Sequence, residues 1–200
     1  MSSLISSNPS SQEGVCGCSF DTLQIMTDLR NTQTVVDFGV VLDLGYRLYE
    51  QGLKVVNCKY CRRSQQSSIS TLPVLAKQCL TLFEAACSAY NISRRDRLFD
   101  PIAAPLNEPL SEFICIKAKV TLGEVELEGE EAEMLAKMLL NRNLLRLAEL
   151  LESLKEVLSI SLKDDCPPQR TLTLRSCQSS VDTTIHRLAV LVEQIGVESC

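Results

Sequence analysis

Aromatic residues are scarce in this chain of 200 residues, which has no tryptophan and only 4% phenylalanine and tyrosine. Its hydrophobic core must therefore be built mainly from leucine, valine, isoleucine, alanine and cysteine. Because these residues recur at helical spacing along most of the chain, the sequence predicts an all-α fold. The length suits one domain and is sufficient to bury a sizeable core.

Histidine is almost absent as well. The single histidine, His186, follows Asp182 by one helical turn, and we interpret the two as a pair on the surface. The chain offers no Ser–His–Asp or Cys–His arrangement, and it contains neither a P-loop nor a GxGxxG motif. Glu130 and Glu131 are interpreted as carboxylates that favour a helix N-terminus. We therefore predict that the chain is not an enzyme and has no catalytic residues.

Long apolar runs and an excess of basic residues are missing too. No run of about 18 apolar residues occurs and the N-terminus lacks the regions of a secretory signal, so we expect no transmembrane helix and no secretion. The thiols are then expected to be reduced, in the nucleus or the cytoplasm. The formal net charge is −5, unlike the basic face of DNA-reading domains. We therefore predict no DNA-binding residues, no direct nucleic-acid contact and no membrane contact.

The order of polar and apolar segments predicts one domain with a tail. Residues 1–14 are polar and rich in serine, which is typical of a disordered tail. Residues 15–197 are predicted to form a single helical regulatory domain with a long, proline-bearing loop at 91–112. Alternating residues predict a small extended segment or β-ribbon near 113–127. The whole is predicted to be a bundle of about five helices.

Apolar periodicity places these helices at about 20–30, 34–57, 73–90, 130–163 and 179–195. The first should turn Phe20, Leu23 and Met26 inward. A break is expected at Pro167 and Pro168, before the last helix.

The helix at about 130–163 carries leucines at spacings of four and three, which is a heptad repeat. This pattern predicts either a dimerising coiled coil or a helix packed within the core. Four further apolar residues, at 139, 145, 150 and 157, widen the apolar face and favour core packing. The seam itself consists of Leu140, Leu144, Leu147, Leu151, Leu154 and Leu158.

Cysteine, by contrast, is abundant, with ten residues. Cys16 with Cys18 and Cys58 with Cys61 form two close pairs, which an antiparallel pairing of the first two helices would bring together. Four thiolates could then hold one tetrahedral zinc ion, so these residues are the candidate metal ligands. Because Cys-x-Cys is tighter than the usual zinc knuckle, free thiols are favoured over zinc. A redox pair is disfavoured, since Cys58 is expected at a helix C-terminus, where the dipole would raise its pKa.

Several segments, taken in order along residues 15–195, resemble a known family. The first half shows the Cys16-x-Cys18 opening, the Asp37-Phe38 region and Cys58-x-x-Cys61, followed by a serine-rich break. The second half shows Leu82-Phe83-Glu84-Ala85-Ala86-Cys87, Leu122-Gly123-x-Val125-x-Leu127, a Leu/Arg-rich helix through Arg142, Arg146 and Leu151, and a final helix. Together they resemble the C-terminal regulatory region of fungal zinc-cluster transcription factors, the class that includes the aflatoxin regulatory protein family.

The resemblance implies a nuclear transcription regulator, often of a secondary-metabolism gene cluster, that contacts proteins of the transcription machinery or a second copy of itself. Such factors read DNA through an N-terminal module in which six cysteines bind two zinc ions, and residues 1–15 hold no such cluster. The chain is therefore expected to be part of a longer factor or a regulator without its own DNA reader. The alternative is a stand-alone zinc-stabilised scaffold or ligand-binding bundle, unrelated to transcription and located in the cytoplasm.

Overall fold

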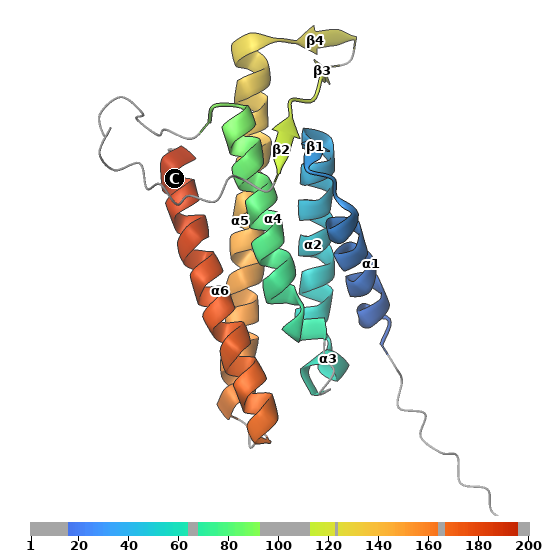
Figure 1. Cartoon of the computed structure of the whole chain (residues 1–200), viewed down its shortest axis with the longest axis vertical. Helices are drawn as coiled ribbons and strands as arrows, with labels where there is room; N and C mark the ends of the chain where they lie inside the picture. The colour runs from blue at the N-terminus through green and yellow to red at the C-terminus, as the bar shows by residue number, and fades with distance from the viewer. Residues whose placement is uncertain (1–15, 64–67, 93–112, 123, 164–166, 196–200) are drawn as a thin grey trace, which may run out of the picture.

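The structure, a computed structural model, describes residues 16–63, 68–92, 113–122, 124–163 and 167–195 (Figure 1). The predicted tail at 1–14 and nearly all of the predicted loop at 91–112 lie outside these residues. The helices are α1 (Cys18–Asn31), α2 (Phe38–Asn57), α3 (Lys59–Arg63), α4 (Leu72–Ala89), α5 (Gly129–Lys163) and α6 (Pro168–Ile195), with a short 3-10 helix η1 (Ser68–Ser70). The strands are β1 (Val35–Asp37), β2 (Ile114–Ile116), β3 (Val120–Leu122) and β4 (Val125–Leu127).

The described residues form an all-α bundle with a small amount of β-structure, as predicted. Five long helices lie side by side, and the short helix α3 lies at one end (Figure 1). At the other end β1 pairs with β2 in parallel, with Val36 opposite Cys115, and β3 pairs with β4 antiparallel. Residues 35–37 are therefore a strand where a helix is predicted, because they pair with a segment far along the chain. No helix in the described part of the chain combines the length and apolar character that crossing a membrane requires.

The core is centred on α5, which packs against α2, α4 and α6. All six leucines of the heptad seam are buried, none more than 3% exposed, in agreement with core packing. Leu150 and Val157 are buried as well. Leu145, however, is 55% exposed, so it does not widen the core face as predicted. The leucine seam therefore packs against the neighbouring helices inside the bundle.

Two glycines allow α2 to approach its neighbours closely. A Cβ atom at Gly45 would lie 2.5 Å from Cζ of Phe83, and one at Gly52 would lie 2.6 Å from the methyl groups of Leu150. Glycine costs a helix interior about 1 kcal/mol relative to alanine. The close contacts of α2 with α4 and α5 offset this cost, since a larger residue at either position would push a buried side chain out of place.

α1 packs on α2 and α4 with a face that differs from the predicted one. Its buried residues are Thr22, Ile25 and Leu29. Phe20 is 74% exposed and Leu23 is 52% exposed, so the prediction that they point inward is wrong, while Met26 is half-buried against the core. Apolar residues occur on both faces of this helix, so the sequence alone does not show which face is buried. Thr22 is tolerated inside because its hydroxyl donates to the carbonyl oxygen of Cys18 at 2.7 Å.

α6 begins at Pro168, well before the predicted start at 179. Proline is favoured as the first residue of a helix, because the N–H that it lacks would have no partner there. The pair Pro167-Pro168 therefore starts a helix instead of only breaking one. The apolar spacing of the last helix predicts an inner stripe of Val181, Ile185, Leu188, Val192 and Ile195. Val181, Leu188 and Ile195 are buried, whereas Ile185 and Val192 are only half-buried against the core.

Candidate metal centre

Four cysteines meet where α1, α2 and α3 come together, at the end of the bundle opposite the strands (Figure 1). Cys16 and Cys18 lie at the start of α1, Cys58 joins α2 to α3, and Cys61 lies within α3. α1 and α2 run antiparallel, so the N-terminus of the first lies beside the C-terminus of the second. The four sulfur atoms consequently lie within 4.8 Å of one another, as the hairpin interpretation predicts.

The spacing of the sulfur atoms is close to that of a tetrahedral metal site. A zinc–sulfur bond of about 2.3 Å places the sulfur atoms of a tetrahedral site about 3.8 Å apart. The Sγ atoms of Cys16 and Cys61 are 3.5 Å apart, and no pair in the cluster exceeds 4.8 Å. Shifts of about 1 Å or less in side-chain position would therefore produce four-thiolate coordination.

Polar contacts around the cluster hold the start of α1 in place. The carbonyl oxygen of Cys18 accepts a hydrogen bond from Nε2 of Gln51 in α2 at 3.2 Å. The hydroxyl groups of Ser19 and Ser68 lie 3.1 Å apart, which joins α1 to η1. On the other side, Nε of Arg62 donates to the carbonyl oxygen of Val56 at 2.6 Å and fixes the turn between α2 and α3. Hydrogen bonds within the protein thus hold the backbone of both cysteine pairs in place without a metal.

The four thiols lie in different electrostatic environments. Backbone N–H groups of Cys61 and Tyr60, at the start of α3, hydrogen-bond to the Cys58 sulfur and lower the pKa of Cys58 to about 7. Burial raises the pKa of Cys18 to about 11 and also raises the pKa of Cys61. The prediction that a helix C-terminus raises the pKa of Cys58 is therefore wrong, because this residue ends α2 and also precedes α3. The Cys-x-x-Cys pair thus begins a helix, although a helix and not a strand comes before it.

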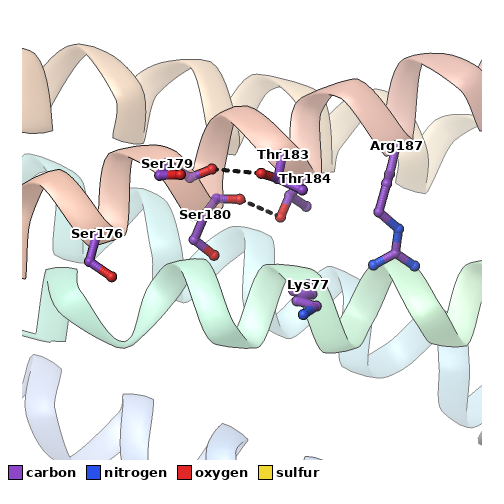
Figure 2. Close-up of a pocket in the computed structure, with 7 residues that line it drawn as sticks. All are labelled: Lys77, Ser176, Ser179, Ser180, Thr183, Thr184 and Arg187. Carbon is purple, nitrogen blue, oxygen red and sulfur yellow. Dashed lines mark hydrogen bonds between the residues drawn. The ribbon is translucent and has the colours of Figure 1, made fainter.

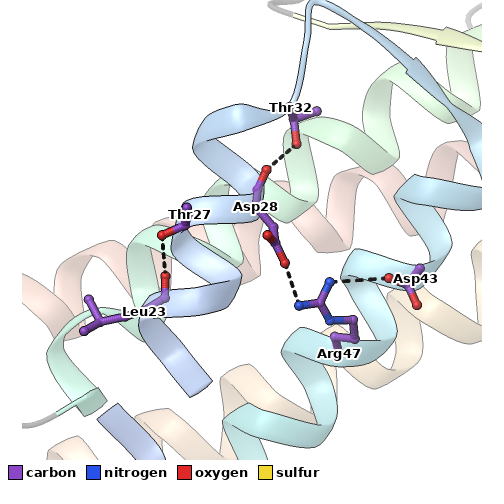
Figure 3. Close-up of polar contacts among 6 residues, drawn as sticks. All are labelled: Leu23, Thr27, Asp28, Thr32, Asp43 and Arg47. Carbon is purple, nitrogen blue, oxygen red and sulfur yellow. Dashed lines mark hydrogen bonds and ion pairs between the residues drawn. The ribbon is translucent and has the colours of Figure 1, made fainter. Parts of the chain in front are cut away.

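An ion-pair cluster fastens α1 to α2 away from the cysteines (Figure 3). Arg47 of α2 donates to the carboxylate of Asp28 at 2.6 Å and lies 3.6 Å from that of Asp43. The Asp28 carboxylate raises the pKa of Arg47. Because Arg47 and Asp28 are about one-third exposed and Asp43 is more exposed, solvent screens these ion pairs and each contributes little to stability.

The remaining described cysteines are part of the core. Cys79, Cys87, Cys115 and Cys177 are all buried. Burial raises the pKa of both Cys79 and Cys87 to about 12, so these thiols stay protonated and behave as small hydrophobic residues.

The single histidine contributes nothing to the cluster. His186 is exposed on α6, and the carboxylate of Asp182 forms an ion pair with Lys155 of α5 at 2.9 Å. The predicted pair of Asp182 with His186 is therefore replaced by a link between two helices. Lys155 lies far from Asp182 in the sequence, so local spacing could not reveal this partner.

A polar groove that the sequence does not predict lies between α4 and α6 (Figure 2). It measures about 460 Å³ and is lined by Lys77, Ser176, Ser179, Ser180, Thr183, Thr184 and Arg187. Three of its polar side chains are engaged within the protein. Thr183 and Thr184 each donate to a backbone carbonyl of α6 at 2.8 Å. Nη2 of Arg187 donates to both carboxylate oxygens of Glu84, at 2.7 and 2.9 Å. The groove lacks metal-binding side chains, and the cysteine cluster remains the candidate site.

Comparison of the chain with protein-family models, with curated proteins and with solved structures found no match.

Proposed function

We propose that the chain is a protein-binding regulatory domain of a fungal zinc-cluster-type transcription factor, built on a helical bundle that a structural zinc ion stabilises. The observation that carries the structural part is the convergence of Cys16, Cys18, Cys58 and Cys61 within 4.8 Å. The regulatory part rests on the family resemblance and on the acidic net charge of −5, which suits contacts with proteins better than contacts with DNA.

The chemistry of the four donors suits zinc. Thiolates are soft ligands, and a set of four sulfur atoms in a tetrahedral arrangement is typical of structural zinc. Cys16, Cys18, Cys58 and Cys61 would all bind the ion through Sγ, which leaves no open position for water or substrate. The role of the ion would therefore be structural, and the proposal includes no catalytic step.

The benefit of such an ion lies in the fastening of α1. This helix has three buried residues, and its polar links to α2 include the hydrogen bond from Gln51 to the Cys18 carbonyl and the partly exposed contact of Arg47 with Asp28. A zinc ion would join the N-terminus of α1 to the α2–α3 junction across more than 40 positions of sequence. Because such a site does not exist in the unfolded chain, its binding free energy would add to the stability of the fold.

We further propose that the domain acts in the nucleus through contacts with the transcription machinery or with a second copy of itself, and that secondary-metabolism genes are the targets. The second candidate is a stand-alone zinc-stabilised scaffold or ligand-binding bundle in the cytoplasm. The cysteine cluster supports it equally, because the cluster stabilises the bundle whatever the bundle binds.

The experiment that separates the two candidates tethers the chain to a foreign DNA-binding module and measures reporter output. A regulatory domain changes the output, and the double variant Cys58→Ser/Cys61→Ser reduces the change. Cys177→Ser is the matched control, since a serine there can still donate to the carbonyl oxygen of Ser70, which the thiol does at 3.7 Å. Unchanged output together with one zinc ion per chain would reject the regulatory proposal and leave the scaffold.

A further inference from the structure

The cysteine cluster brings together thiols that lie far apart in the sequence, and this permits a reaction besides metal binding. Sγ of Cys16 and Sγ of Cys61 are 3.5 Å apart, although 45 positions separate the residues. A disulfide needs a sulfur–sulfur distance of about 2.05 Å, so a side-chain movement of about 1.5 Å is sufficient. We propose that the cluster is an oxidation site, at which hydrogen peroxide replaces the metal with two disulfides, the first joining Cys16 to Cys61.

Each disulfide uses one molecule of peroxide. A thiolate sulfur attacks one peroxide oxygen, the O–O bond breaks, and a sulfenic acid and a hydroxide ion form. The second thiolate attacks the sulfenic sulfur, so that the S–S bond forms while the S–O bond breaks and releases another hydroxide ion. Two electrons pass from the two sulfur atoms to the peroxide, and two protons convert the hydroxide ions to water. Two such reactions consume four thiolates, and a zinc ion that has lost its ligands leaves.

Among the eight cysteines that the structure describes, exposure favours oxidation of the cluster. Cys16, Cys18 and Cys58 are half-buried and therefore reachable by a small oxidant, while Cys61 lies behind them with 2% exposure. Cys79 and Cys87 are fully enclosed in the core. Peroxide should thus oxidise the cluster before any core thiol.

The pairing decides what happens to α1. A disulfide between Cys16 and Cys61 leaves Cys18 and Cys58 for the second bond, and both bonds then connect the start of α1 to the α2–α3 junction. Disulfides within each pair would instead detach the start of α1. The 3.5 Å contact favours the first arrangement, so the oxidised domain keeps α1 fastened after the metal has gone. The release of zinc rests on the proposed function, whereas the disulfide does not.

The test treats the full chain with about two equivalents of hydrogen peroxide after its zinc content has been measured. Released zinc is followed with a chromophoric chelator, and disulfides are mapped by mass spectrometry after tryptic digestion without reduction. Trypsin cuts after Lys59, which places Cys58 and Cys61 on separate peptides, whereas Cys16 and Cys18 share the peptide that ends at Arg30. Cys18→Ser therefore serves to assign the bond to Cys16.

The expected result is release of one zinc ion per chain, loss of the four free thiols of the cluster, and a link from the Arg30 peptide to the Cys61 peptide that persists in Cys18→Ser. Cys177→Ser should leave the links unchanged. A link between the Cys58 and Cys61 peptides, or loss of the Cys61 link in Cys18→Ser, would overturn the inference. A chain without zinc before the treatment would overturn the proposed metal centre instead, and the peptide map would still decide the disulfide.

Discussion

Replacement of Gly45 by alanine tests the close packing of α2 most directly. The added Cβ would lie 2.5 Å from Cζ and 3.1 Å from Cε1 of Phe83, and 3.3 Å from Oδ1 of Asn143. Phe83 is completely buried, so its ring cannot swing aside without displacing other core residues. Gly39, in the first turn of the same helix, has no atom within 4 Å of an added Cβ. Both substitutions therefore favour the helix, Gly39→Ala by less because it lies in the first turn, and they differ above all in packing.

The change in the free energy of unfolding caused by Gly45→Ala is the sum of two opposing effects. Overpacking of a core costs about 1–3 kcal/mol, and a rigid, fully enclosed ring places Gly45→Ala near the upper end. Alanine recovers about 1 kcal/mol of helix propensity. The free energy of unfolding should consequently fall by about 2 kcal/mol, which lowers Tm by about 4–8 °C for a chain of this size. Gly39→Ala should stabilise the protein by about 0.5 kcal/mol.

Urea denaturation, followed by circular dichroism on zinc-loaded protein, measures both changes. The midpoint of Gly45→Ala should shift to lower urea at an unchanged slope, since the exposed surface of the unfolded chain is the same. Gly52→Ala should fall between the two, because the methyl groups of Leu150 can rotate away. If Gly45→Ala proved as stable as Gly39→Ala, the contact between α2 and α4 would be looser than the structure shows and the reasoning would be refuted.

Three further predictions concern the cysteines and the strands. Cys58→Ser should reduce bound zinc from about one ion per chain to nearly none. It should also speed hydrogen exchange of α1 amides but not of α5 amides, and an equal increase in both helices would contradict a role of the zinc site in holding α1 to the bundle. Burial raises the pKa of Cys79 from 9.0 to about 12. The contribution of this protonated thiol to the free energy of unfolding is therefore fully present below about pH 9 and is lost as the pH rises toward about 12. Urea midpoints under reducing conditions should therefore fall between about pH 9 and 11, and less steeply in Cys79→Ala; parallel curves would argue against this origin. Tyr90→Phe removes the hydroxyl oxygen that accepts from the N–H of Ala118 at 3.0 Å and should lower the free energy of unfolding by about 1 kcal/mol in the same assay, whereas an unchanged value would show that water replaces the oxygen.

Local sequence signals predicted the elements that depend on local chemistry. α4 was expected at 73–90 and is found at Leu72–Ala89, because Pro73 marks its start and apolar residues fill one broad face. α5 likewise follows its acidic start and its leucine seam to Lys163. The juxtaposition of the two cysteine pairs was also predictable, since two consecutive helices with a short connection pack antiparallel and bring the chain back to its starting end.

The errors arise where a distant partner decides the local conformation. Val35 and Val36 continue an apolar pattern that suits a helix, yet pairing with residues 114–116 makes them a strand. The inward face of α1 depends on what α2 and α4 offer, which the helix itself does not encode. The pKa of Cys58 depends on the turn into α3, whose five residues are too few to give a periodic signal.

The position of the cysteine cluster in the chain has a consequence for synthesis. All four thiols belong to the first 61 residues, whereas α5, the main packing partner of α2, ends only at Lys163. At about 5–20 residues per second, a ribosome needs about 5–20 seconds to make the segment between them. With the proposed zinc site, the nascent hairpin of α1 and α2 would hold the ion throughout that interval, before most of its future neighbours exist. Metal supply in the cell would then influence the yield of folded protein from the moment that α3 has been synthesised.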